Sequence, residues 1–368
     1  MVEENFFRER VERFQQLMRE NNIDASMIRT LSSFIYFTGV KWLRPALLIP
    51  AEGEPVAFIF EYEADEFKEK TWIKNVKTWR RTPELMGSVT KAIREGNYKR
   101  VGFDYSVERD SFVLFFELFK KLNPKVEVVD VHALIMKLRM IKDLKEIEYI
   151  QKASNIVVKG ISSAIDAIDT NVSEAEIASE AIYTMMKSGS EHPHVYVNVG
   201  SKPRVHAEPR SNVKVKPGDV ISMVVGADFN NYHSNMSRTV FMGNPSEEKR
   251  EALETMIKVH DLAASSLKPG VKFIEIENKI KELIEKKGFG KYYVEGFVHS
   301  VGLLIEEDPI TTIVVQHRRY EAVENMVLAF IHAPLTIPGI GSIKCEDTFA
   351  VKADGVKKLT EYEYDIVK

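Results

Sequence analysis

Apolar residues in the first third of the chain alternate between helical and strand spacing. Within residues 4–21 they recur every three or four positions, beginning at Phe7 and Val11, which predicts an amphipathic helix. The short apolar runs IDASMI, ALLIP and PVAFIF are separated by Gly and Pro and predict strands. Helices are also predicted near 83–95 and 110–122, each followed by a strand, RVGFD and VEVVD. A mixed α/β domain is therefore expected.

The rest of the chain has longer helical patterns and longer strands. The segment IKDLKEIEYIQKASNIVVKGISSAIDAID predicts an amphipathic helix, and Ser173 with Glu176 forms the capping box of the next one. Strand patterns follow in VYVNVG, DVISMVVGAD and SRTVFMG and, after two more helices, in EGFVHSVGLLI, MVLAFIHAPL and SIKCEDTFAV. This predicts an α+β domain. We expect the boundary within 130–141 and divide the chain into domains 1–132 and 133–368.

Composition narrows the class of protein. The chain of 368 residues is too long for one ordinary core, which agrees with two domains. Its net charge of -3 offers no global positive field for nucleic acid or an anionic membrane. A single cysteine cannot form an internal disulfide, no apolar run is long enough to span a bilayer, and the N-terminus is charged. We expect a cytoplasmic protein without nucleic-acid or membrane partners, and the Lys- and Glu-rich composition hints at a thermophile.

Several segments resemble, in the same order, motifs of the creatinase/prolidase/methionine aminopeptidase family. MIKDLKEIEYIQKA is similar to the helix that opens the family's catalytic domain, and VKPGDVISMVVGADFNNYHSNMSRTVFMG to its central hairpin. FVHSVGLLIEEDP is similar to its histidine strand, and SIKCEDTFAV, followed by GVKKLT, to its last glutamate strand. In the first domain, IYFTGV resembles the family's Tyr-Thr-Gly turn.

The resemblance covers nearly the whole chain and implies its architecture and activity. It implies an N-terminal mixed α/β domain of the creatinase type, a C-terminal pita-bread domain and a homodimer. It also implies a hydrolase, similar to creatinase or Xaa-Pro dipeptidase, that cleaves a C–N bond (amide, amidine or imino-peptide) in a small molecule or short peptide. Metal-dependent members hold two divalent cations with two Asp, one His and two Glu.

Only part of that ligand set is present here. One Asp position falls on Val224, which has no donor atom. The other falls on Asn235, whose amide oxygen cannot bridge two cations as a carboxylate does. The His position is His299 and the last Glu position is Glu346. We therefore do not expect the family's dinuclear centre.

The position of the remaining Glu is ambiguous. Counting backward from PGIGSIKCED places it on His332, and counting forward from Met326 places it on Ile331. A shift of one residue along a strand reverses the face to which a side chain points. Two neighbouring positions also depart from the peptidase pattern, because Glu306 replaces a histidine and Lys344 replaces an arginine.

The leading interpretation is hydrolysis without a metal or other cofactor, as in creatinase. His206 in RVHAEP would act as the acid or base at neutral pH. Glu346 and Glu307 would orient water or bind a cationic group. Three residues would bind the substrate, the two arginines through its carboxylate: Arg238, Arg204 and His299.

Two other interpretations stay open. In one, a single divalent cation (Zn, Fe or Mn) is held by His299, His332, Glu346 and Asn235, because two imidazoles and a carboxylate suit such ions. In the other, the pita-bread fold is a catalytically silent binding protein. His299 then has the ordinary role of a hydrogen-bonded histidine in an apolar strand.

Overall fold

The computed structural model describes the whole chain except residues 1, 107, 109, 206, 365 and 366. The chain forms two compact units, Met1–Arg139 and Met140–Lys368. The division lies inside the expected segment 130–141, but after Arg139 rather than after residue 132. The reason is that helix α6 (His132–Arg139) packs against α1 of the first unit. Among the described residues, none of the helices combines the length and the apolar character needed to cross a bilayer.

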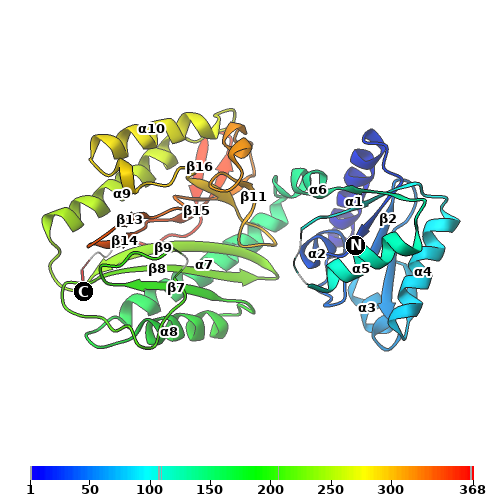
Figure 1. Cartoon of the computed structure of the whole chain (residues 1–368), viewed down its shortest axis with the longest axis horizontal. Coiled ribbons are helices and arrows are strands. Elements are labelled where there is room, and N and C mark those ends of the chain that lie inside the picture. Colours follow the sequence, from blue (N-terminus) through cyan, green and yellow to red (C-terminus); the bar gives the residue numbers. More distant parts are fainter. Residues whose placement is uncertain (1, 107, 109, 206, 365–366) are drawn as a thin grey trace. The chain divides into compact units, whose positions relative to one another are not determined.

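The first unit is built on a six-stranded sheet in the order β4-β3-β2-β1-β5-β6 (Figure 1). Strand β2 runs antiparallel to its neighbours, and the other five strands run parallel to one another. Apolar residues of α4 and α5 join those of the sheet in one core. The elements are α1 (Val2–Glu20), β1 (Ala25–Ile28), α2 (Leu31–Thr38), β2 (Leu47–Pro50), β3 (Val56–Phe60), α3 (Ala64–Lys70), β4 (Asn75–Trp79), α4 (Thr82–Glu95), β5 (Arg100–Phe103), α5 (Asp110–Leu122), β6 (Glu127–Asp130) and α6.

The second unit places antiparallel sheets of five, three and two strands (the last is β13-β14) between two pairs of helices (Figure 1). Helices α7 (Leu144–Asp166) and α8 (Glu174–Lys187) share a core with the three-stranded sheet β7-β8-β9. Helices α9 (Glu247–Ser266) and α10 (Phe273–Lys286) share another with the five-stranded sheet β11-β10-β12-β15-β16. The strands are β7 (His194–Val199), β8 (Val220–Phe229), β9 (Tyr232–Phe241), β10 (Val298–Ser300), β11 (Glu307–Ile310), β12 (Val327–Phe330), β13 (Leu335–Ile337), β14 (Gly341–Ile343), β15 (Asp347–Lys352) and β16 (Gly355–Lys358).

The helix starts of the second unit follow the capping signals in the sequence. The Ser173 hydroxyl oxygen accepts a hydrogen bond from the backbone N–H of Glu176, and the Glu176 carboxylate accepts one from the backbone N–H of Ser173, so the predicted capping box is confirmed. Asp143 and Glu146 form the same motif at the start of α7. The predicted order of a mixed α/β domain and then an α+β domain is also confirmed.

Candidate functional site

His299 lies in the middle of the short strand β10 and is fully buried. Its Nδ1 lies 3.0 Å from the carbonyl oxygen of Ser300, an acceptor, so Nδ1 carries the proton of the neutral ring. Nε2 then presents a lone pair, and it lies 3.5 Å from Oε1 of Glu346. When the ring is neutral, two acceptor atoms thus lie next to each other.

A β-bulge at the end of β12 decides which side chain reaches this site. The N–H groups of Ile331 and His332 both donate to the carbonyl oxygen of Phe297, at 2.6 and 3.3 Å. Ile331 has a φ of +66°, which is rare for a β-branched residue, and its side chain belongs to the apolar core. The His332 ring therefore takes the other face, with its centroid 4.7 Å from that of His299.

Glu346 is the buried carboxylate of the site. Its backbone exchanges hydrogen bonds with that of Ser237 on β9, which fixes its position between the two sheets. Oε2 lies 2.9 Å from Nζ of Lys344, which is itself almost wholly buried. Burial by itself raises the pKa of Glu346, but the nearby ammonium of Lys344 opposes burial, and the pKa is held below its ordinary value. The carboxylate is therefore ionised at neutral pH, with a counter-charge from its own chain.

Three buried atoms at this site have no hydrogen-bond partner among the described residues: Asn235 Oδ1, His299 Nε2 and Glu346 Oε1. Acceptors buried without a donor are costly unless a water or a cation satisfies them. His299, His332 and Glu306 also offer ligand atoms that lie within 4.8 Å of one another. Two imidazoles and a carboxylate suit one divalent cation. This donor set therefore fits a single cation.

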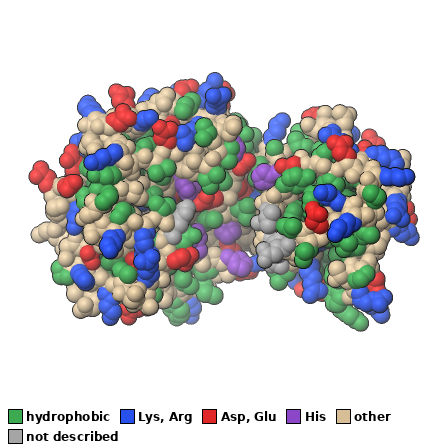
Figure 2. All heavy atoms as spheres, in the orientation of Figure 1, with side chains coloured by type: hydrophobic (Ala, Val, Ile, Leu, Met, Phe, Trp, Pro, Cys, Tyr) green, Lys and Arg blue, Asp and Glu red, His purple; other side chains and the backbone are tan. Residues whose placement is uncertain are grey.

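A small cavity of about 20 Å³ adjoins the cluster. Val224, His332 and Lys344 are among the residues that line it, and the volume has room for about one water molecule. Glu306 lies nearer the surface, with its Oε1 3.8 Å from Nε2 of His332 and its side chain 29% exposed. Figure 2 shows His and acidic side chains of the second unit gathered on one part of its surface.

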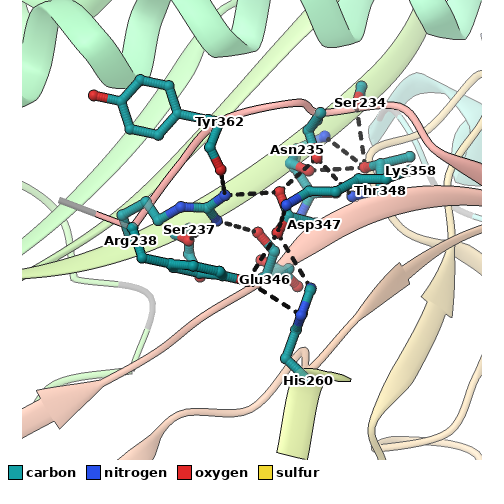
Figure 3. Close-up of polar contacts among 12 residues, drawn as sticks. Ser234, Asn235, Ser237, Arg238, His260, Glu346, Asp347, Thr348, Lys358 and Tyr362 are labelled. Carbon is teal, nitrogen blue, oxygen red and sulfur yellow. Dashed lines mark hydrogen bonds and ion pairs between the residues drawn. The ribbon is translucent and has the colours of Figure 1, made fainter. Parts of the chain in front are cut away.

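Arg238, expected to bind a substrate carboxylate, is committed to the protein interior (Figure 3). Its guanidinium donates to Asp347 Oδ1 at 3.0 Å and to the backbone oxygens of Ser237, Glu346 and Tyr362. Asp347 also lies 3.2 Å from Nε2 of His260. This geometry favours a positioning role for Arg238, because its guanidinium donates to the backbone carbonyl of Glu346 and so helps to fix that residue.

The other predicted residues lie in different surroundings. Arg204 forms an ion pair with the buried Glu174, so its guanidinium also has an internal partner. Glu307 pairs with the fully buried Lys142 at 3.0 Å, away from the surface. His206 lies outside the described residues. The structure places His299 and His332 beside Glu346. The ligand roles of these residues and of Asn235 stay predictions, as do the roles of His206, Arg204, Arg238 and Glu307.

Two residues of the cluster were not predicted as site residues, namely Lys344 and Glu306. In an extended segment, positions two apart share a face, so Lys344 and Glu346 point the same way. Because of this spacing, Lys344 could have been predicted from the sequence to lie beside Glu346. Glu306 has no comparable signal, because it precedes β11 in an irregular segment.

Two protein-family models match this chain. Residues 148–353 match Metallopeptidase family M24, and residues 10–141 match the Creatinase/Prolidase N-terminal domain. The chain is 28% identical to the Xaa-Pro dipeptidase of Pyrococcus furiosus over 98% of its own length and 100% of the relative's. It is 29% identical to that of Pyrococcus horikoshii, over 98% and 99%.

Solved structures agree with this relationship. The prolidase from Pyrococcus horikoshii OT3 superposes with a TM-score of 0.86 at 28% identity, covering 97% of this chain and 99% of that one. The prolidase from Pyrococcus furiosus gives 0.83 at 28% identity, covering 95% and 99%. The expected pita-bread architecture behind a creatinase-type domain is confirmed. The chain belongs to metallopeptidase family M24, with a creatinase/prolidase N-terminal domain ahead of its pita-bread domain.

Proposed function

We propose that this chain hydrolyses a C–N bond in a short peptide or a related small amide, at a site that holds one divalent cation instead of two. The relatives named Xaa-Pro dipeptidase support this reaction class. The observation that carries the proposal is a pair of buried ligand atoms, His299 Nε2 and Glu346 Oε1, which lie 3.5 Å apart and have no hydrogen-bond partner among the described residues. Our expectation that no cofactor is needed is therefore replaced by a single-cation site.

Two features support one cation over a pair. Val224 offers no ligand atom at the position where the family resemblance places an aspartate. Lys344 brings a fixed positive charge to within 2.9 Å of Glu346, where a second dication would meet electrostatic repulsion. The single ion would be held by His299, Glu346 and His332. Glu306 and Asn235 could serve as additional ligands. When bound, such an ion acidifies a coordinated water and polarises a substrate carbonyl.

The residues of the chain have their own tasks in this proposal. The carbonyl of Ser300 fixes the tautomer of His299, so that Nε2 always presents its lone pair to the site. Lys344 keeps Glu346 ionised and holds it in one place. His332 has Nδ1 on the side of Glu346 and Nε2 on the side of the partly exposed Glu306, so Glu306 favours a ring that carries its proton on Nε2 and leaves Nδ1 to bind the ion.

The first test combines metal content with turnover. Protein purified without a histidine tag is incubated with manganese, cobalt, zinc or iron(II), desalted and analysed by mass spectrometry. We expect about one ion per chain, and cleavage of Xaa-Pro or other dipeptides that a chelator abolishes. His299→Ala should lose the ion, while His192→Ala, on an exposed loop, should keep it. Two ions per chain would contradict the single site.

The other outcomes also decide the matter. A bound ion without turnover of any short peptide or small amide would favour the silent binding protein. Turnover without a bound ion would support metal-free hydrolysis, with His206 as the acid or base. A homodimer, a cytoplasmic location and a thermophilic source stay predictions.

A further inference from the structure

The first unit has an open cleft of about 890 Å³ at one edge of its sheet. Arg29, Phe60 and Trp79 line it, and they stand at or just beyond the ends of the parallel strands β1, β3 and β4. Open α/β sheets bind ligands at the carboxyl ends of their parallel strands. The volume is also in the range of small-molecule sites. Position and size therefore both suit a bound ligand.

The charges lining this cleft are unbalanced. Of the described residues that line it, none is acidic and four are arginines. Arg80 is paired with Glu61, and Arg81 with Glu84. The contacts of Arg29 and Arg44 among the described residues are with the Pro45 carbonyl and with aromatic rings, and none is with a carboxylate. Within the described part of the chain, the cleft thus carries two positive charges without a counter-charge.

Arg29 is held rigidly in spite of lacking a counter-charge. Its Nη1 donates to the carbonyl oxygen of Pro45, and its Cζ lies 4.2 Å from the ring centroid of Phe115. Its Nε is buried without an acceptor among the described residues. Burial lowers the pKa of Arg29 to about 10, which reflects the cost of removing this cation from water. An anion in the cleft would repay that cost.

The rest of the wall is apolar. The guanidinium of Arg44 lies over the rings of Phe60 and Trp79, at 5.5 and 6.0 Å from their centroids. Leu43 and Leu114 line the same cleft and are 57% and 74% exposed. Large apolar side chains that stay exposed beside a cleft mark a surface that another molecule covers. The occupant should therefore have an apolar body as well as a negative charge.

We propose that this cleft binds a small organic anion, a carboxylate with an apolar or aromatic body. Arg29 and Arg44 hold its charged group, and the aromatic and leucine side chains cover its body. The inference concerns the first unit alone and does not depend on the hydrolysis proposed for the second.

The test uses the full chain and a charge-matched pair of probes. Isothermal titration calorimetry measures binding of 4-phenylbutyrate and of the neutral 4-phenylbutyramide. We expect the carboxylate to bind at least tenfold more tightly than the amide. Arg29→Met and Arg44→Met should each weaken carboxylate binding at least tenfold. Arg13→Met, an exposed arginine of α1 outside the cleft, should leave it unchanged.

Several results would overturn the proposal. Equal affinity for 4-phenylbutyrate and 4-phenylbutyramide would show that the arginines do not bind the carboxylate charge. Unchanged affinity in both cleft variants, or no binding by the wild type at millimolar concentrations, would exclude the site. Arg44 is exposed, so its variant stays informative if Arg29→Met misfolds. If 4-phenylbutyrate does not bind and Arg44→Met shifts a monomer–dimer equilibrium in sedimentation, the cleft is a contact between copies.

Discussion

Lys344 gives the buried carboxylate of Glu346 a counter-charge from only two residues away. Both side chains are inside the protein, where an unpaired charge is expensive and a paired one is tolerated. In the proposed site, the same pair would set the charge that an ion meets at His299 and His332. Each of these histidines is placed by a backbone feature, His299 by the carbonyl of Ser300 and His332 by the bulge after Phe330.

Replacing Lys344 by Met should increase the affinity of the site for a divalent cation at least tenfold. The variant leaves Glu346 buried without its partner, which costs about 3–5 kcal/mol of folding stability. A bound cation would restore that stability. Thermal unfolding with and without manganese or zinc, together with calorimetric titration, measures both effects. Lys357→Met, exposed on β16, is the control. An unchanged cation affinity would show that Lys344 does not limit binding.

At the scale of elements, helix α10 is joined to the segment that follows it by a buried acid. Tyr293 Oη donates to Glu277 Oε1 at 2.8 Å, and Glu277 is almost wholly buried. Burial raises the pKa of Glu277, and the hydrogen bond from Tyr293 only partly opposes this. The folded protein therefore binds this proton more tightly than the unfolded chain does.

Glu277→Gln should stabilise the protein at neutral pH, and the gain should vanish in acid. Between the ordinary pKa of 4.5 and the raised one, the folded state holds more protons, so wild-type stability falls as pH rises through that window. The Gln variant does not titrate. Urea unfolding between pH 4 and 8 compares the two proteins, with the exposed Glu282→Gln as control. A difference that stays constant with pH would contradict the argument.

Elements with a clear hydrophobic period or a cap could be predicted from the sequence. Helix α5 coincides with the predicted 110–122, and α8 begins at the predicted capping box. Helix α2 could not be predicted, because almost all of its side chains are buried and its apolar run has no polar face. The direction of the His332 side chain could not be predicted either. The segment is one residue longer than the family motif, and the bulge at Ile331, whose φ is positive, accommodates the additional residue.

The candidate site was predictable only where residues stand at matching motif positions. His299 and Glu346 could be named because their motifs survive in the sequence. The internal partners of Arg238 could not be foreseen, since it contacts Asp347 from 109 positions away along the chain. Pairings of that range are decided by how the two sheets pack and leave no periodic signal.

At the scale of the whole molecule, each unit has a core of its own. The core of the first unit joins α4, α5 and its sheet. The second unit contains two clusters, one under α7 and α8 and one under α9 and α10. Units with separate cores can unfold separately.

Differential scanning calorimetry should therefore resolve two transitions. We expect 4-phenylbutyrate to raise the transition temperature of the first unit only, and a divalent cation that of the second unit only. At a hundredfold excess over Kd, each ligand should add about 2.7 kcal/mol to the free energy of unfolding of its unit. Val89→Ala in α4 and Ile280→Ala in α10, both fully buried, would assign the transitions. A single transition that responds to both ligands would mean that the units unfold together.

The Lys344–Glu346 pair also limits how a second cation could be engineered into the proposed site. Aspartates introduced at Val224 and Asn235 would add two negative charges to a site that keeps its own ammonium group. A second dication would still meet that ammonium, so the two acids would bring little advantage until Lys344 changed as well. Replacing the lysine first would produce a variant with an uncompensated buried charge. Building a two-cation site would therefore need more changes than the two ligand positions alone.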